Sequence, residues 1–245
     1  MNDFRLKNGV LVQDSISGME IIIPDDVTVL GYGAFYNWTK LVSARLPEGL
    51  ITIGDYAFSC CERLEFINIP ETVTSIGSHA FTLCEKLKEI SIPDGMTSIG
   101  EQAFAMCFSL EKIEIPDSVI ELGENAFLAC TNLNYIRYHH IGFSLNESFT
   151  WEQAVETAGQ LENLLQNPKQ EALLLWLKEH FDSLQLIDAG DFEKILQTGK
   201  IFDKNNIDDF IRLANEKNLY EIQLLLMNYK AEHIGYDDIQ NKFQL

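Results

Sequence analysis

Five of the six prolines in this chain recur at one fixed interval, and that interval constrains the fold more than any other feature. They are Pro24, Pro47, Pro70, Pro93 and Pro116, each 23 residues after the one before. A glycine, an alanine–phenylalanine pair, a leucine and a cysteine recur with the same step. Self-similarity at a fixed period indicates a repeat protein in which each unit buries its apolar edge against its neighbours. We therefore expect a solenoid of about five stacked coils.

The repeating columns define one unit, which reads P-x-x-V-T-x-I-G-x-x-A-F-x-x-C-x-x-L-x-x-I-x-I. Its columns are Gly31, Gly54, Gly77, Gly100 and Gly123; the alanines 34, 57, 80, 103 and 126, each followed by Phe35, Phe58, Phe81, Phe104 or Phe127; Leu41, Leu64, Leu87, Leu110 and Leu133; and Cys61, Cys84, Cys107 and Cys130, with Trp38 in the equivalent earlier place. Alternating apolar residues before each proline predict a strand, and proline ends it because proline has no N–H for the ladder. A leucine and isoleucine framework with a period of roughly 20 to 29 residues is typical of a leucine-rich repeat.

The isoleucine–proline and GxxAF elements of this unit, as in IPETVTSIGSHAFTLC at residues 69–84, resemble those of the BspA-like leucine-rich repeats. The resemblance covers roughly residues 1–140. It implies a right-handed solenoid with a parallel sheet on its concave side, and it implies no chemistry. The dipeptide Asn8-Gly9 predicts a hairpin turn between FRL and VLV, so we expect residues 1 to about 22 to form an N-terminal β-hairpin cap.

From about Glu147 onward, spacings of three and four replace the long period and predict helices. The expected helices cover a stripe from Trp151 to Leu165, a run after Pro168 that includes residues 172–177, a short segment at 192–199, a segment opening at Asn206, and residues 219–229. The predicted fold class is α+β, with a repeat domain at residues 1–141 and an all-α module at residues 142–245. The segments AGDFEKIL and NLYEIQLLL weakly resemble ankyrin-type helical hairpins. We expect the module to cap the last coil, with a second binding surface as the lesser alternative.

The chain is acidic, with 37 Asp and Glu against 18 Lys and Arg and a formal net charge of −19. The charge is shared between the two halves, −10 up to residue 140 and −9 after it. Such a surface repels phosphate groups, so we expect neither nucleic acid nor an anionic membrane as a partner. We expect no membrane insertion, because no run of ~18 apolar residues occurs. The start of the sequence has no secretory signal, and the expected location is therefore the cytoplasm.

Residues with chemical potential are few, and each has a structural interpretation. Stacking can bring the column cysteines within disulfide range, but Trp38 fills the same column and a reducing compartment keeps thiols free. We expect a core role for these four cysteines, whereas Cys60 lies outside the column. The chain contains no CxxC, HExxH, GxSxG or GxxxxGK[ST] motif, and its five histidines, including the pair His139-His140, show no metal-ligand spacing. We therefore expect no catalytic residue, no cofactor and no metal.

The remaining candidate site is the concave face of the solenoid, onto which alternate strand residues project. Its outward residues are Ser43, Arg45, Phe66, Asn68, Glu89, Ser91, Lys112, Glu114, Tyr135 and Arg137. The set mixes both charges and includes two aromatic residues. Tyr, Phe and Arg are enriched at the cores of protein interfaces. A solvated sheet surface without a partner is the alternative interpretation.

We predict a non-enzymatic interaction module that binds an unidentified protein through this concave face. The family resemblance implies a second hypothesis, a cell-surface adhesin, because several BspA-like proteins bind host or matrix proteins at the cell surface. A third hypothesis is a small enzyme with a site between solenoid and helices. Self-association is a fourth, since the terminal coil or the last helix can leave an apolar edge.

Overall fold

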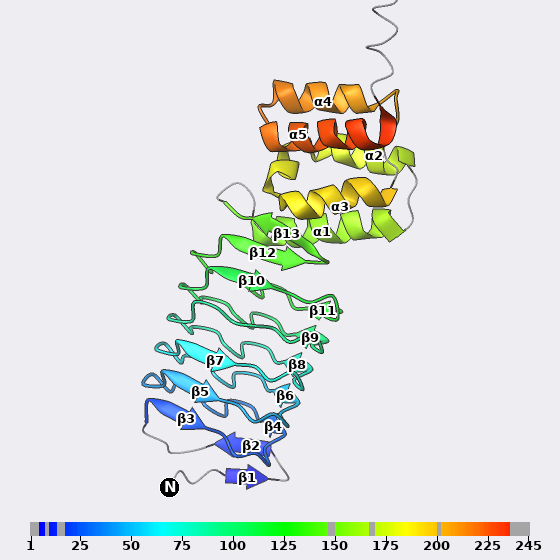
Figure 1. Ribbon diagram of the computed structural model, residues 1–245. Helices are drawn as coiled ribbons and strands as arrows, with labels where there is room; N and C mark the ends of the chain where they lie inside the picture. Colours follow the sequence, from blue (N-terminus) through cyan, green and yellow to red (C-terminus); the bar gives the residue numbers. More distant parts are fainter. Residues whose placement is uncertain are drawn as a thin grey trace, which may run out of the picture. The chain divides into compact units, whose positions relative to one another are not determined.

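The computed structural model describes residues 5–7, 10–13, 18–146, 150–166, 170–199 and 202–235. The chain divides into two compact units, residues 1–140 and 141–245 (Figure 1). The first is a stack of coils built from short strands and turns, and the second is helical. We call them the repeat unit and the helical unit and describe each by itself.

One side of the repeat unit carries a seven-stranded sheet that was not predicted from the sequence. Its strands, in spatial order, are β1 (Arg5–Lys7), β2 (Val10–Gln13), β4 (Val29–Leu30), β6 (Thr52–Ile53), β8 (Ser75–Ile76), β9 (Ser98–Ile99) and β11 (Glu121–Leu122). All pairs after β1–β2 are parallel and join residues of successive coils, such as Ile53 with Ile76. The V-T-x-I segment of the repeat forms these strands because Val73 and Ile76 turn into the core while the residues between them remain partly accessible.

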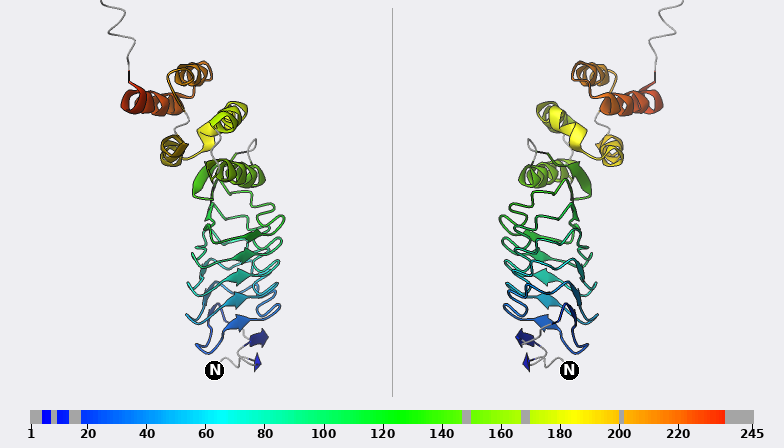
Figure 2. Two further views of the ribbon diagram at one scale, coloured as in Figure 1. Left: turned by 90° about the vertical axis from the view of Figure 1, so that its right-hand side faces the viewer. Right: turned by 90° about the vertical axis from the view of Figure 1, so that its left-hand side faces the viewer.

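The other side carries the strands that the alternating residues before each proline predict. They are β3 (Glu20–Ile22), β5 (Ser43–Arg45), β7 (Phe66–Asn68), β10 (Lys112–Glu114) and β12 (Tyr135–Tyr138). They pair in parallel as β3-β5-β7 and as β10-β12. Residues 89–91 form no strand, so the predicted single sheet is interrupted in the fourth coil. Ile90 and Ile92 still face the core, where each is 7% exposed, and the coil stack continues through the interruption (Figure 2).

A column of phenylalanine rings runs through the core of the repeat unit. Phe35, Phe58, Phe81, Phe104 and Phe127 stack in order, with ring centroids 5.1, 5.3, 5.3 and 5.6 Å apart. The planes of the last four rings lie within 8° of parallel to their neighbours. The stack forms because each coil repeats the Ala-Phe pair, with the small alanine where backbones approach and the ring beside its equivalent in the next coil.

The turns around this pair hold residues other than glycine in the left-handed backbone region. One such column comprises Tyr56, His79, Gln102 and Asn125, with φ between 51° and 57°, and Gly33 takes the equivalent place in the first coil. A second comprises Asn37, Cys60, Leu83, Met106 and Ala129, with φ between 57° and 61°. The invariant glycine of the repeat serves a different purpose. A Cβ on Gly100 would lie 2.5 Å from the backbone nitrogen of Ser78, so glycine is required there for close approach of adjacent coils.

The N-terminal cap differs from its prediction. β1 and β2 pair as an antiparallel hairpin, while the predicted turn residues Asn8 and Gly9 lie outside the described residues. β3 pairs in parallel with β5 and so belongs to the repeating coils, which overturns the predicted cap boundary near residue 22. The reason is that residues 20–22 keep the alternating strand pattern and the spacing to Pro24 that later coils show.

Within its described residues, the helical unit contains the five predicted helices together with a strand, a 3₁₀ helix and a π-helical turn. After the strand β13 (Ile141–Ser144) come α1 (Trp151–Gln166), α2 (Gln170–Glu179), a 3₁₀ helix (Phe181–Leu186), α3 (Ala189–Gly199), α4 (Ile207–Glu216), α5 (Tyr220–Tyr229) and a π-helical turn (Lys230–Ile234). Pro168, the predicted start of the second helix, lies outside the described residues. The 3₁₀ helix was not predicted. Its Phe181 is 2% exposed and packs with Phe210 of α4, so it supplies core side chains.

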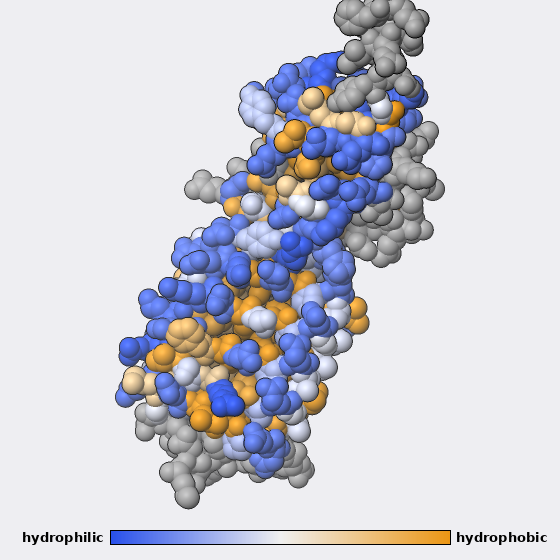
Figure 3. Space-filling model, in the orientation of Figure 1, coloured by the Kyte–Doolittle hydropathy of each residue, from blue (hydrophilic) through white to orange (hydrophobic). Residues whose placement is uncertain are grey.

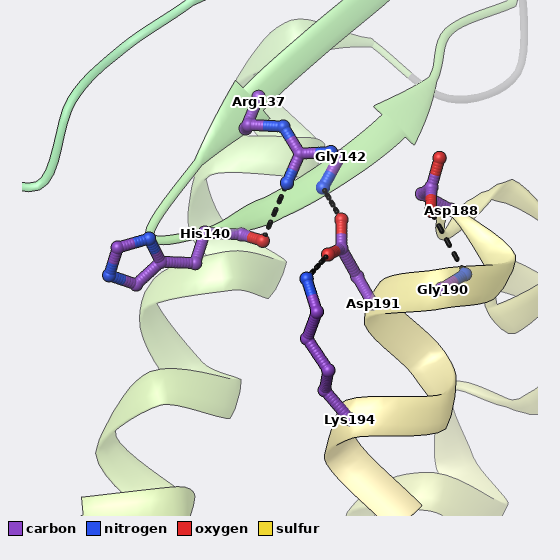
Figure 4. A network of polar contacts seen from close by, with 7 residues as sticks. All are labelled: Arg137, His140, Gly142, Asp188, Gly190, Asp191 and Lys194. Carbon is purple, nitrogen blue, oxygen red and sulfur yellow. Dashed lines mark hydrogen bonds and ion pairs between the residues drawn. The ribbon is translucent and has the colours of Figure 1, made fainter.

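An aspartate pair joins the strand of the helical unit to α3. Asp191 is 3% exposed, and its carboxylate accepts hydrogen bonds from the Gly142 backbone N–H at 3.1 Å and from the Lys194 ammonium at 2.9 Å (Figure 4). Asp188 accepts from the Gly190 N–H at 3.0 Å, just inside the helix. A carboxylate before the first turn satisfies N–H groups that have no partner within the helix. The start of α3 is thereby fixed to β13.

Candidate binding groove

The strands β3, β5, β7, β10 and β12 each place two side chains on the outer surface, and their parallel registers align these side chains into rows. Ser43 lies beside Phe66, and Arg45 beside Asn68. Lys112 lies beside Tyr135, and Glu114 beside Arg137 in the same way. The repeat spacing of 23 residues is the physical cause, because each coil returns the chain to the same position in its neighbour.

These rows lie in a groove of about 1260 Å³ along this side of the repeat unit. The space-filling view shows a hollow with apolar side chains at its floor and polar side chains around it (Figure 3). Of the predicted residues, the lining includes Ser43, Arg45, Phe66, Asn68, Glu89, Ser91, Lys112, Glu114 and Arg137. Tyr135 is outside the lining. The structure therefore brings all but one of the predicted residues to a common surface, even though 89–91 form no strand.

The groove has an apolar end formed by its first coils. Ile22 is 68% exposed and Phe66 is 67% exposed, both on outward strand positions. Arg45, also exposed, lies next to Ile22 in the row. Large apolar side chains on a soluble protein can be exposed singly without a function. Two of them in one groove, with an arginine between their strands, match the composition of an interface core.

The opposite end of the groove carries polar and charged side chains. The guanidinium of Arg137 donates a hydrogen bond of 2.9 Å to the His140 carbonyl (Figure 4), and the imidazole of His140 contacts the carboxylate of Asp117. His139 and His140 both have left-handed backbone angles, φ 49° and 61°. Burial raises the pKa of the neighbouring Tyr138, and the negative charge of Asp117 raises it further. Arg137 thus has a structural role at the end of the groove in addition to lining it.

Charges around the groove are mixed, with an acidic excess. The acidic lining residues are Glu20, Glu65, Glu89, Asp94, Glu114 and Asp117, and the basic ones are Arg45, Lys112 and Arg137, apart from His140. The outward strand positions alone are close to balanced, so the excess comes from the rims. A groove that carries charges of both signs favours a partner whose charges lie opposite them, and the partner's net charge matters less.

Several residues that line the groove were not predicted from the sequence. Glu20 and Ile22 were assigned to the cap, although they precede Pro24 by the same spacing that places Arg45 before Pro47. That spacing was the signal that could have found them. Asp117 and Ser118, which follow Pro116, also line the groove, and no strand pattern marks them.

The thiols expected in the core lie there. All five cysteines are free, and Cys61, Cys84, Cys107 and Cys130 are buried whereas Cys60 is partly accessible. Each column thiol donates to the carbonyl oxygen of a phenylalanine in the preceding coil, at 3.1 to 3.3 Å. Burial raises the pKa of all four, to about 12 for Cys61 and about 11 for Cys130. These thiols stay protonated at neutral pH, so they have no thiolate for nucleophilic chemistry.

In the part of the chain that the structure describes, no group of three or more His, Cys, Asp or Glu side chains is placed to hold a metal ion. None of the helices within the described ranges is both long enough and apolar enough to cross a membrane.

Comparison with known proteins identifies the repeat unit. The family model for the BspA type leucine-rich repeat region matches residues 13–138 with six copies. This is one copy more than the five coils expected from the prolines, because the match begins inside the predicted cap. The solved structure of a leucine-rich repeat protein from T. pallidum is 29% identical, with a TM-score of 0.54 over 56% of this chain and 68% of that one. A leucine-rich repeat protein from Bacteroides ovatus is 32% identical, with a TM-score of 0.51 over 56% of this chain and 39% of that one.

A search of curated proteins gives no match. The family model ends before the helical unit, whose likeness to ankyrin hairpins remains a prediction. The match covers half of the chain and includes the proline, glycine, alanine–phenylalanine and cysteine columns that build the coils. This chain belongs to the family of BspA-type leucine-rich repeat proteins.

Proposed function

We propose that this chain is a non-enzymatic binding protein that recognises another protein through the groove of its repeat unit. The observation that carries the proposal is the alignment of Ile22, Arg45, Phe66 and Asn68 in adjacent rows of one groove of about 1260 Å³. Interface cores contain aromatic and arginine anchors surrounded by polar rims, and this end of the groove has that composition.

The rigidity of the surface supports the same proposal. β5 and β7 lie on a core of stacked rings and buried isoleucines, so their outward side chains are held on a fixed backbone. Binding to a preformed surface orders fewer groups and therefore costs less entropy. Membership of the BspA-type family agrees with an interaction role.

The direct test is affinity capture from the lysate of the source cell, followed by mass spectrometry. Wild-type protein is compared with an Arg45→Ala/Phe66→Ala/Asn68→Ala variant. Arg137 is left unchanged, because its hydrogen bond to His140 would make loss of binding ambiguous. A matched control, Thr28→Ala/Ile120→Ala/Glu121→Ala, removes three exposed side chains from the other face of the same unit.

We expect wild type and the control to capture one common protein. The groove variant should capture at least about tenfold less of that protein, because it lacks the anchor residues. Circular dichroism and thermal melting must show that both variants are folded. If groove variant and wild type capture the same proteins, the groove is not the recognition surface. A partner found only with surface fractions would favour the cell-surface hypothesis over the cytoplasmic one.

A further inference from the structure

The residue that follows each repeat proline is acidic in all five coils. These residues are Asp25, Glu48, Glu71, Asp94 and Asp117, which are 23 positions apart and all exposed. Each comes directly after the proline that ends a groove-side segment, so the five carboxylates form one column along an edge of the groove. Asp94 and Asp117 belong to the groove lining itself. We call this column the acidic rim.

The carboxylates of the acidic rim are close enough to repel one another. Adjacent coils lie ~4.8 Å apart where their strands pair, so the column from Asp25 to Asp117 is about 19 Å long. Like charges side by side on neighbouring strands are destabilising. The stability of the fold therefore does not explain why every coil carries a carboxylate at this place.

The columns on either side of the acidic rim contain no basic residue. The column before it consists of the five prolines, and the column after it consists of Asp26, Gly49, Thr72, Gly95 and Ser118. The basic residue nearest to the rim along the chain is Arg45, three positions before Glu48, and no ion pair joins the two in the part of the chain that the structure describes. The chain itself thus leaves most of the rim charge without a counter-charge.

The last carboxylate of the acidic rim shows which kind of group the rim accepts. His140 comes 23 positions after Asp117 and takes the next place in the same column. The imidazole of His140 contacts the carboxylate of Asp117. Among the described residues, Asp117 is the one member of the rim with an ion-pair partner, and that partner is a basic side chain one step along the column. The other four carboxylates offer the same contact to basic side chains of another molecule.

We infer that the partner protein lies along the groove as a basic segment, whose lysine and arginine side chains pair with the acidic rim. The inference rests on the proposed function and adds to it the chemistry of the partner. Charges placed opposite one another along an interface speed association and fix its register. Alternate side chains of an extended chain are ~6.6 Å apart, so three or four basic residues at alternate positions match the length of the rim. The exposed ring of Phe66 in the same groove offers a guanidinium group a face for stacking.

The probe for the test is a fluorescein-labelled peptide of four arginines that alternate with glycines, and fluorescence anisotropy measures its dissociation constant with the full chain. The rim variant, Glu48→Gln/Glu71→Gln/Asp94→Asn, removes three rim charges and leaves the contact of Asp117 with His140 in place. The matched control, Glu62→Gln/Glu101→Gln/Glu124→Gln, removes three exposed charges outside the groove lining. Both variants change the formal net charge by three units, from −19 to −16, so the general attraction of a basic peptide falls equally in both.

We expect the rim variant to bind the peptide at least about fivefold more weakly than wild type, because it lacks three exposed ion pairs, and the control to stay within about twofold of wild type. Citrulline in place of arginine keeps the shape of the peptide and removes its charge, so it should weaken binding by about tenfold or more. Added sodium chloride should weaken binding of the arginine peptide, because salt screens exposed charges. Circular dichroism checks that both variants are folded.

Equal weakening by the rim variant and the control would overturn the inference, since net charge and not the rim would then attract the peptide. No binding by wild type at low salt would overturn it as well. Tight binding of calcium ions by wild type without peptide, lost in the rim variant, would assign the rim to a metal ion instead. Failure of the proposed function is a separate result, because the Arg45→Ala/Phe66→Ala/Asn68→Ala variant keeps the rim intact. A partner that this groove variant loses and the rim variant retains would leave the proposed function standing and overturn the basic segment.

Discussion

The thiol of Cys84 donates a hydrogen bond of 3.3 Å to the backbone carbonyl of Phe58, one coil earlier in the stack. Cys107 makes the same bond to Phe81, and Cys61 and Cys130 make it to their own equivalents. The phenylalanine column and the cysteine column are therefore linked by hydrogen bonds. Each coil adds one ring to the stack, and its thiol donates a hydrogen bond to the phenylalanine carbonyl of the coil before it. This arrangement leads to predictions about pH, packing and turns.

Stability of the repeat unit should fall as the pH rises above about 9, where thiols of an unfolded chain ionise. Burial raises the pKa of Cys61 to about 12 and that of Cys130 to about 11, and it raises the pKa of Cys84 and Cys107 well above the ordinary range. At pH values above about 9 and below the raised pKa values, the thiols of the unfolded chain have lost protons that the thiols of the folded chain retain. Stability is thus fully present below pH ~8.5 and is lost toward pH ~11, by up to about 1.4 kcal/mol per pH unit for each thiol.

Urea titrations at several alkaline pH values measure this slope. A Cys84→Ala/Cys107→Ala variant should start less stable, because it loses two thiol–carbonyl bonds, yet it should show a shallower decline with pH. Equal slopes for the two proteins would contradict the assignment. A thiol reagent at neutral pH should modify Cys60 first and reach the column cysteines only on unfolding.

Phe81→Ala should destabilise the repeat unit by about 3 to 5 kcal/mol. Phe81 is fully buried and stacks on both sides, against Phe58 and Phe104, each with centroids 5.3 Å away. Phe81→Leu is the matched control, because it keeps most of the apolar volume and loses the ring stacking, and it should cost less than half as much. Chemical denaturation followed by circular dichroism gives both values. A loss below about 1 kcal/mol for Phe81→Ala would mean that the stack collapses around the cavity.

Asn125→Val should destabilise the repeat unit by about 1 to 2 kcal/mol, although Asn125 is exposed. Its φ is 56°, a left-handed backbone conformation that asparagine adopts readily and that β-branched residues avoid. Asn125→Gly is the control, and it should leave the free energy of unfolding nearly unchanged. If Asn125→Val and Asn125→Gly lower the free energy of unfolding equally, the loss comes from the asparagine side chain and not from the backbone conformation.

The sequence was most informative where one residue type serves one geometric need in every coil. Pro47, Gly100 and Phe81 belong to columns of this kind, so the coil architecture and the row that contains Arg45 and Phe66 could be predicted. Alternation also placed Asn68 on the outer surface, because strand geometry depends on neighbouring residues alone.

Features that depend on contacts between coils could not be predicted in the same way. The bond from Cys84 to Phe58 requires the distance between two backbones, and the sequence gives only the column. The second sheet was missed because strands of two residues, such as Thr52–Ile53, carry too little alternation to be recognised. Ile22 was not predicted to line the groove because it was assigned to the cap. Asp117 and His140 were not predicted because they lie where the repeat pattern ends.

The helical unit should depend on one buried carboxylate. Asp191→Ala should lower its free energy of unfolding by about 1 to 3 kcal/mol, because the Gly142 N–H would be left buried without its acceptor. The ion pair with Lys194 adds less, since the lysine side chain is 73% exposed and solvent screens its charge. Lys194→Ala should therefore cost much less than Asp191→Ala. Glu193→Ala, an exposed carboxylate on the same helix, is the matched control and should be nearly neutral.

Hydrogen exchange measured by mass spectrometry separates this effect from changes elsewhere. Loss of the acceptor should increase exchange in β13 and in the first turn of α3, while the coils around Phe81 keep their protection. If Asp191→Ala and Lys194→Ala destabilise equally, the ion pair dominates and the bond to Gly142 does not. If neither changes exchange at β13, the carboxylate does not anchor this strand, because a buried N–H that lost its only acceptor would open more often.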